Sequence, residues 1–366
     1  MAQTQRVRIG VVGAGLIGQV EHIPNLRRLE RLYELVGIAD ASPAMRGELE
    51  SRGFRTFDGY EKLLDAGIDA VLVAAPDQYH AEITLQALAR GKHVFCEKPL
   101  CFSVAEAEEI AAAQAKAGKV VQVGYMKRFD PSYEKLLTLL PRDASQLRMI
   151  SVEVQDPDSW PFNQHQGDFV KTSDIPAEMI ADGKRRRDAQ VARAVGRTLT
   201  PAEMWGYTNS YCSSLIHDIN VVHGILEALQ VETGEVIGAA FVAGGDGGHG
   251  SVRLQGHDAI WQMTHLFVHK VAEYKERVTL YFNDCVYELS FPSPYLNHFP
   301  TRLIISRSDG TCWQNTEYRA SYDEAFIQEL IGFWKSVVEG APVRNTIAAA
   351  TRDLRLVQQL AAAATR

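Results

Sequence analysis

The stretch Arg6-Val-Arg-Ile-Gly-Val-Val-Gly13-Ala-Gly-Leu-Ile-Gly18 decides the fold of this 366-residue chain. It begins with the apolar, β-branched pattern of a short buried strand, and an apolar helical pattern follows the glycines. Gly13 permits a tight turn, Gly15 lets the backbone approach a pyrophosphate, and Gly18 lets the helix pack closely. A glycine-rich turn without a ligand is the alternative. The strand before and the helix after favour a turn that binds a dinucleotide.

The same α/β alternation continues up to residue 124. Further strand patterns are separated by helical patterns, and they lie at 35–39, 54–57, 70–75, 92–96 and 120–124. Such alternation predicts a parallel sheet wrapped by helices.

Asp40 closes the second strand pattern at the distance from Gly18 that is typical of the acidic residue in a dinucleotide-binding fold. Its carboxylate would accept hydrogen bonds from the adenosine ribose and repel a 2′-phosphate, which favours NAD over NADP. Arg46 lies close enough in sequence to keep NADP as the less favoured cofactor. An Asp that caps the helix opened by Ser42-Pro43 is the structural alternative.

The character of the sequence changes near Tyr125 to Pro131. Residues 148–155 and several runs between 235 and 319 have short strand patterns divided by turn residues, and 160–227 is mainly helical. We therefore expect an α/β fold, in which a doubly wound parallel sheet of Rossmann type precedes an α+β domain with a mostly antiparallel open sheet. The expected parts are a nucleotide-binding domain at 1–125, a substrate and oligomerisation domain at 126–320, and C-terminal helices at 321–366 that pack back on both.

Composition excludes several classes of protein. Hydrophobic residues make up 46% and charged residues 23% of the chain, and no apolar run approaches the ~18 residues of a membrane span. A net charge of −7 argues against nucleic-acid and anionic-membrane partners. The five cysteines form no Cys-x-x-Cys pair, so we expect neither a disulfide framework nor a metal site. No targeting pattern begins the chain, which predicts a cytoplasmic location.

Two further motifs follow strand patterns of the first domain. Ala75-Pro76 with His80 comes after the strand at 70–75, and Glu97-Lys98-Pro99 comes after the strand at 92–96. A lysine at a desolvated strand end near a nicotinamide favours the negative charge that develops on a reacting hydroxyl, and burial would lower its own pKa. A surface lysine that caps a helix is the alternative.

Together these motifs resemble the glucose–fructose oxidoreductase / inositol dehydrogenase / MocA family. The resemblance rests on the glycines at 13–18, Ala75-Pro76 with His80, the run 91–100, and Arg128-Phe129-Asp130-Pro131. It is strong over 6–135, loose around His217 and the C-terminal helices, and slight over 156–210 and 230–320. It implies that Lys98 lies beside the nicotinamide and the reacting hydroxyl, with Glu97 and Pro76 on the cofactor side.

The resemblance also gives His217 the role of removing the hydroxyl proton, a task that suits an imidazole because its ordinary pKa lies near neutral pH. A core histidine is the alternative. Many family members carry Asp four residues earlier, where this chain has Ser213. A hydroxyl donates or accepts a hydrogen bond but does not share a proton as a carboxylate does. Asp218 or nearby tyrosines are candidate replacements, and proton chemistry that differs from simple alcohol oxidation is the alternative.

The expected function is therefore an NAD-dependent oxidoreductase that oxidises a secondary hydroxyl of a sugar, polyol or sugar derivative. The first alternative is an NAD-dependent glycoside hydrolase that works by transient oxidation, elimination, water addition and re-reduction. The second is a dinucleotide-binding sensor without catalysis. The expected partner is a small carbohydrate, and the open sheet predicts a homo-oligomer.

The expected site comprises three groups of residues. The catalytic residues are Lys98 and His217. The cofactor contacts are Gly13, Gly15, Leu16, Ile17, Gly18, Asp40, Ala75, Pro76, His80, Glu97 and Lys98. The substrate contacts are Lys98, Tyr125, Arg128, Trp160, Asn209, Tyr211 and His217. The basic run 184–187 is typical of a solvated helix face, with contact to an anionic substrate group as the alternative.

Overall fold

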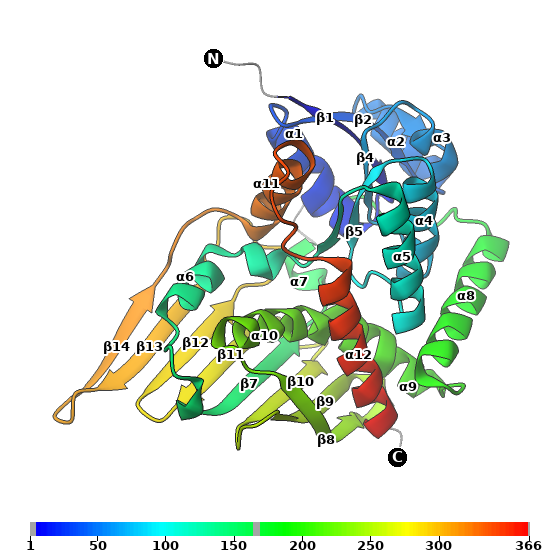
Figure 1. The fold of residues 1–366 in the computed structure, drawn as a ribbon. Coiled ribbons are helices and arrows are strands. Elements are labelled where there is room, and N and C mark those ends of the chain that lie inside the picture. The colour runs from blue at the N-terminus through cyan, green and yellow to red at the C-terminus, as the bar shows by residue number, and fades with distance from the viewer. Residues whose placement is uncertain (1–4, 164–168, 365–366) are drawn as a thin grey trace. The chain divides into compact units, whose positions relative to one another are not determined.

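The computed structural model describes residues 5–163 and 169–364, which fall into two compact units (Figure 1). Within the described residues, the first unit comprises 5–125, 169–198 and 326–352, and the second comprises 126–163, 199–325 and 353–364. The chain passes between the units after Tyr125, where the pattern of the sequence changes. The segments 169–198 and 326–352 group with the first unit by their contacts, although they follow this point in the sequence.

A six-stranded parallel sheet forms the centre of the first unit, in the order β3-β2-β1-β4-β5-β6. Its strands are β1 (Val7–Val12), β2 (Tyr33–Ala39), β3 (Thr56–Phe57), β4 (Ala70–Val73), β5 (His93–Glu97) and β6 (Val121–Gly124). The helical segments between them are η1 (Gly18–His22), α1 (Ile23–Arg28), α2 (Pro43–Ser51), α3 (Tyr60–Leu64), η2 (Asp77–Tyr79), α4 (His80–Ala89) and α5 (Val104–Ala117). The predicted doubly wound parallel sheet is confirmed.

Two later helices complete this unit, namely α8 (Ala177–Val195) and α11 (Ala325–Val338). The apolar side of α11 carries Leu330, Phe333 and Trp334 into the core formed by the sheet. The Tyr33 hydroxyl donates to the Leu330 carbonyl at 2.6 Å, and the Trp334 indole N–H donates to the Gln5 carbonyl at 3.0 Å. Buried aromatic residues thus fix α11 while their polar atoms remain satisfied.

The second unit is built on an eight-stranded sheet in the order β14-β13-β12-β11-β7-β10-β9-β8. Its strands are β7 (Leu147–Asp156), β8 (Thr233–Phe241), β9 (Gly247–Leu254), β10 (Ile260–Phe267), β11 (Lys275–Phe282), β12 (Cys285–Phe291), β13 (Arg302–Ser308) and β14 (Trp313–Tyr318). Strands β7 and β10 run parallel, and the other neighbouring pairs run antiparallel. Buried and partly exposed residues alternate along β12, as in a sheet with one covered face. This confirms the predicted mostly antiparallel sheet.

Short helices and two long ones accompany this sheet. They are η3 (Met126–Phe129), α6 (Pro131–Leu139), η4 (Ala144–Gln146), α7 (Trp160–Asn163), α9 (Pro201–Trp205), η5 (Gly206–Leu215), α10 (Ile216–Leu229), η6 (Ala243–Gly245) and α12 (Ile347–Ala364), the last of which contributes its residues from Asp353 onward. Asp353 accepts from the Asn220 amide at 2.7 Å and contacts a His223 ring nitrogen at 2.5 Å, which ties α12 to α10. Among the described residues, no helix has the length and apolar character needed to cross a membrane.

Helical backbone also precedes the helix that carries His217. Helical backbone runs from α9 through the π-helical η5 into α10. Thr200 and Glu203 form a capping box that starts α9, with Pro201 in its first turn. A π-helical turn changes the direction of side chains and is frequent near functional sites.

Candidate functional site

The glycine turn after β1 has the shape that its residues predict. Gly13 has φ +95°, and a Cβ there would lie 2.3 Å from the Ala74 carbonyl oxygen, so only glycine fits. A Cβ at Gly18 would lie 2.6 Å from the Gly13 carbonyl oxygen. Gly15 is exposed, and a Cβ there would meet nothing within 4 Å. The open space at Gly15 fits the close approach of a pyrophosphate, and the half-buried Leu16 and Ile17 begin the helix behind it.

Asp40 lies at the end of β2, next to this turn. One carboxylate oxygen accepts from the Ala14 N–H at 2.8 Å, and the other accepts from the Ser42 N–H at 2.9 Å. Arg46 donates to the carbonyl oxygens of Asp40 and Ala41. Arg46 is therefore held at the backbone of this turn, and Asp40 joins the first two strand ends. Its contact with an adenosine ribose stays a prediction.

His80 joins the ends of β4 and β5. Its Nε2 lies 2.7 Å from the Ala75 carbonyl oxygen, and its Nδ1 lies 2.7 Å from the Pro99 carbonyl oxygen. Burial opposes a charge on the ring, but the Cys96 sulfur, the Asp77 carboxylate and the Pro99 carbonyl raise the pKa of His80 to about 10. A protonated ring donates to both carbonyls. His80 therefore positions the loops that carry Pro76 and Lys98.

Glu97, the last residue of β5, is held on both carboxylate oxygens. Its Oε1 lies 2.6 Å from His22 Nε2, and its Oε2 accepts from the Lys98 N–H at 3.1 Å. Burial opposes ionisation of Glu97, but the hydrogen bond and charge of His22, together with Lys98, keep the pKa of Glu97 below its usual value. Gly124 on β6 lies opposite and leaves room for the carboxylate. These contacts fix the backbone from which the half-buried Lys98 projects.

Glu329 of α11 completes a buried group with His22 and Glu97. Ligand-type atoms of the three side chains lie within 4.8 Å of one another. Neither Glu329 oxygen has a hydrogen-bond partner among the described residues. Burial, together with the charges of Glu97 and Glu21, raises the pKa of Glu329 well above its usual value. Burial thus favours a neutral Glu329 beside the His22–Glu97 hydrogen bond.

Sequence reasoning missed three residues near Lys98, namely His22, Asp77 and Glu329. Asp77 directly follows Ala75-Pro76, and burial raises its pKa while the charges of His80 and Lys98 oppose that shift. Its place after the Pro76 motif was a signal for it. His22 is four residues beyond Gly18, but nothing local connects it with Glu97, and Glu329 is more than 200 residues away.

His217 lies in the second unit, at the start of α10, and is partly buried. The adjacent Asp218 is fully buried, with Oδ1 3.9 Å from Lys127 Nζ. Lys127 also forms an ion pair with Glu276, which accepts from the Tyr274 hydroxyl at 2.8 Å. Burial raises the pKa of Asp218 to about 6, against the opposing charge of Lys127. The residue that follows His217 in the chain thus carries a carboxyl group whose pKa lies near neutral pH.

The other expected substrate contacts have local partners. The Tyr125 carbonyl accepts from the Asn345 amide at 2.9 Å, and Arg128 is bonded to Glu227 at 2.7 Å. The Trp160 indole donates to the His269 carbonyl, the Asn209 amide to the Trp205 carbonyl, and the Tyr211 hydroxyl to the His249 carbonyl, at 3.1, 3.3 and 2.9 Å. The structure brings the cofactor candidates together at one sheet edge of the first unit. Lys98 and His217 belong to different units, and their approach to one hydroxyl stays a prediction.

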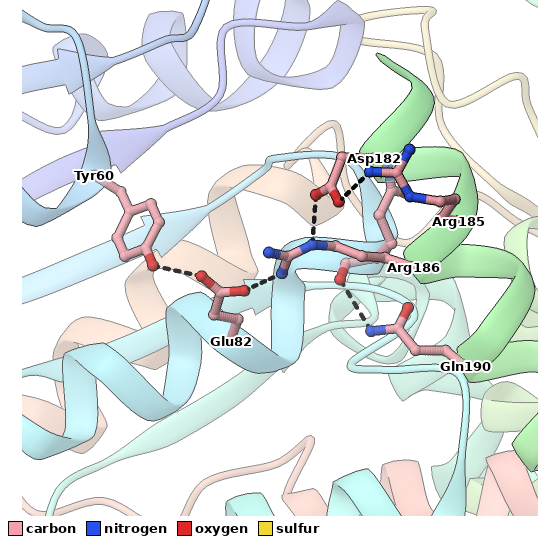
Figure 2. Close-up of polar contacts among 7 residues, drawn as sticks. Tyr60, Glu82, Asp182, Arg185, Arg186 and Gln190 are labelled. Carbon is pink, nitrogen blue, oxygen red and sulfur yellow. Dashed lines mark hydrogen bonds and ion pairs between the residues drawn. The ribbon is translucent and has the colours of Figure 1, made fainter. Parts of the chain in front are cut away.

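The basic run 184–187 lies on α8 (Figure 2). Arg186 bonds Asp182 at 2.7 Å and pairs with Glu82 of α4, which accepts from the Tyr60 hydroxyl at 2.7 Å. Arg185 bonds Asp182 at 3.0 Å. Arg186 therefore connects α8 to α4, a role that neither interpretation of the sequence predicted.

Comparison with known proteins gives a family match in the first unit. The sequence model of the "Oxidoreductase family, NAD-binding Rossmann fold" matches residues 7–125. Inositol 2-dehydrogenase 3 of Saccharopolyspora erythraea is 39% identical over 139 residues, which cover 37% of this chain and 40% of that protein. An uncharacterized oxidoreductase of Bacillus subtilis, YrbE, is 32% identical over 174 residues, or 46% and 49% of the two chains. The chain thus spans half or less of the length of these relatives.

Solved structures share the fold over nearly the whole chain. The UDP-N-acetylglucosamine 3-dehydrogenase GnnA of Acidithiobacillus ferrooxidans aligns with a TM-score of 0.72 at 18% identity and covers 98% of each chain. At this identity the likeness concerns the fold alone.

The two glycines predict separable effects. We expect Gly15→Ala to leave the free energy of unfolding within about 0.5 kcal/mol of wild type, because its methyl group enters open space. The same methyl group should weaken NAD binding about tenfold or more by holding off the pyrophosphate. Gly13→Ala should instead destabilise the protein by about 2 kcal/mol or more. Denaturant unfolding and NAD titration measure both, and normal NAD affinity in Gly15→Ala would contradict the assignment of the loop.

Because Glu329 is buried and neutral, its replacement by glutamine should increase the stability of the folded protein by an amount that depends on pH. The raised pKa of Glu329 means that the folded protein keeps a proton that the unfolded chain releases above pH ~4.3, so wild type loses stability as pH rises. We expect Glu329→Gln to gain stability relative to wild type between pH 5 and 8, by up to about 1.4 kcal/mol per pH unit. The exposed Glu178→Gln is the control, and parallel curves for Glu329→Gln and wild type would exclude a neutral Glu329.

Proposed function

Because the chain belongs to the glucose–fructose oxidoreductase / inositol dehydrogenase / MocA oxidoreductase family, we propose that it is an NAD-dependent oxidoreductase that oxidises a secondary hydroxyl of a sugar, polyol or sugar derivative. One observation carries this proposal: Lys98 follows β5 at the same carboxyl edge of the parallel sheet as the glycine turn after β1. Ligands of this fold bind at that edge. The sequence similarity to inositol 2-dehydrogenase 3 supports a hydroxylated substrate.

The residues of the first unit have distinct tasks in this proposal. The turn at Gly13, Gly15 and Gly18 receives the pyrophosphate, and Asp40 receives the adenosine ribose and disfavours the 2′-phosphate of NADP. NAD supplies the hydride acceptor when it is bound. Lys98 holds the substrate oxygen and stabilises the charge that develops on it. Glu97, fixed by His22, and His80 set the position of the Lys98 backbone.

His217 takes the proton from the reacting hydroxyl. Ser213 stands where many family members carry an aspartate, so another group must accept the proton from His217. Asp218 directly follows His217 in the chain, and its pKa of about 6 suits proton exchange near neutral pH. We propose that Asp218, whose pKa the charge of Lys127 lowers, takes the role of the missing carboxylate.

A redox-neutral glycoside hydrolase is the second candidate, and the Ser213 departure favours it. In that reaction a transient oxidation acidifies the neighbouring C–H, the aglycone is eliminated, water adds, and the hydride returns to the sugar. Our proposal also includes a cytoplasmic location and a homo-oligomer that covers the open sheet of the second unit.

A parallel screen distinguishes these functions. Free sugars, polyols and aryl glycosides are incubated with the protein and NAD, and both NADH and released aglycone are measured. The proposed function predicts NADH in proportion to substrate consumed. Aglycone without net NADH identifies the hydrolase, and NAD binding without either product across the panel identifies a non-catalytic sensor.

His217→Ala should lower turnover by roughly 10²–10⁴-fold, because a positioned general base contributes about that factor. The affinity for NAD should not change, because His217 lies in the second unit and the dinucleotide contacts lie in the first. His223→Ala is unsuitable as a control, because that ring is bonded to Asp353. His257→Ala serves instead, because this half-buried histidine lies in the turn after β9 and has no assigned role in the site. Full activity of the His217 variant would remove this residue from the proposed mechanism.

A further inference from the structure

The segment 169–190 lies along the loops of the first unit that follow three neighbouring strands. It enters the first unit after β7 and ends in α8, and Figure 1 shows α8 beside α4. The family model covers only 7–125, so this segment lies outside the matched part. We call residues 169–190 the strap.

The first anchor of the strap is at the glycine turn after β1. Gln19, directly after Gly18, donates from its side-chain amide to the Val170 carbonyl at 3.0 Å and accepts from the Val170 N–H at 3.0 Å. The same amide donates to the Ala14 carbonyl at 2.8 Å. Val170 packs against the core of the unit. One side chain thus connects the strap to the phosphate loop.

The second anchor is at the end of β2. One Asp174 oxygen accepts from the Ser42 hydroxyl at 2.5 Å, and the other accepts from the Ala44 N–H at 2.8 Å. These hydrogen bonds lower the pKa of Asp174. Ser42 is the N-cap of α2 and donates its own N–H to Asp40. The strap carboxylate therefore occupies donors at a helix N-terminus beside the expected ribose contact.

The third anchor is at the loop after β4. Gln190 donates from its amide to the Gln78 carbonyl at 3.1 Å, and Arg186 pairs with Glu82 (Figure 2). The Arg186 guanidinium carbon lies 5.4 Å from the centre of the Tyr79 ring. Gly183 permits this approach, because a Cβ there would lie 2.8 Å from Gln78 Nε2. The helix is packed closely on the segment that follows Pro76.

These anchors follow β2, β1 and β4, which are adjacent in the sheet. A dinucleotide in this fold lies along the same strand ends, with its pyrophosphate at the glycine turn and its adenosine ribose at the acidic residue after the second strand. We propose that the strap retains the bound dinucleotide, so that its release requires the anchors to open. This proposal rests on the proposed function, because it assumes that the first unit binds NAD.

The rate of dinucleotide release tests the strap. Asp174→Ala and Gln190→Ala each remove an anchor from a side chain that lies outside the core, and Glu178→Ala removes an exposed carboxylate of the same segment as the matched control. Protein loaded with NADH is mixed with excess NAD, and the fall in NADH fluorescence gives the rate. We expect release about tenfold faster in Asp174→Ala, about fivefold faster in Gln190→Ala, and unchanged in the control. The double variant should approach the product of the two factors.

A second measurement separates retention from a general loss of stability. Amide hydrogen exchange over residues 169–190 should slow when NADH is bound to wild type and slow less in the Asp174 variant, while thermal unfolding without nucleotide stays close to wild type. Normal NADH binding with unchanged release rates in both variants would overturn the proposal that the strap retains the dinucleotide, but not the proposed function. A failure of wild type to bind either NAD or NADP would overturn the proposed function, and the strap with it.

Discussion

The imidazole of His80 fixes the distance between two neighbouring strand ends, and the candidate site of the first unit depends on that distance. Its two nitrogens each lie 2.7 Å from a carbonyl oxygen, one after β4 and one after β5. Because both contacts need a donor, the ring is held in its charged form. The loop of Pro76 and the loop of Lys98 then keep one relative position. A neutral or smaller side chain here would leave at least one buried carbonyl without its partner.

Buried charge is organised differently in the two units. In the first, the bond to His22 favours the ionised form of Glu97, while burial favours the neutral form of Glu329. In the second, Lys127 serves both Glu276 and Asp218, and the weaker of these contacts leaves Asp218 with a pKa of about 6. The first arrangement fixes the position of the backbone at Glu97 and Lys98. The second gives the residue after His217 in the chain a carboxyl group with a pKa near neutral pH.

Retention of the dinucleotide would bear on the class of reaction. An enzyme that exchanges NAD and NADH on every turnover needs fast release, whereas one that returns the hydride to the same or a second sugar gains from a cofactor that stays bound. Slow release of the dinucleotide, as proposed for the strap, would therefore suit redox-neutral turnover better than net oxidation.

Local signals in the sequence determined the parallel sheet, its glycine turn and several helix limits. Local signals set both ends of helix α5, because Ser103 caps its start and Gly118, at φ +62°, ends it. Such signals act over a few residues and need no partner. Only the tertiary structure decided that Glu329 lies near Glu97 and that Asp174 binds Ser42. It also decided that Arg186 is an anchor, because a polar helix face has the same sequence pattern whether it faces water or another helix. Pairings between distant residues depend on which faces pack, and periodicity does not record that choice.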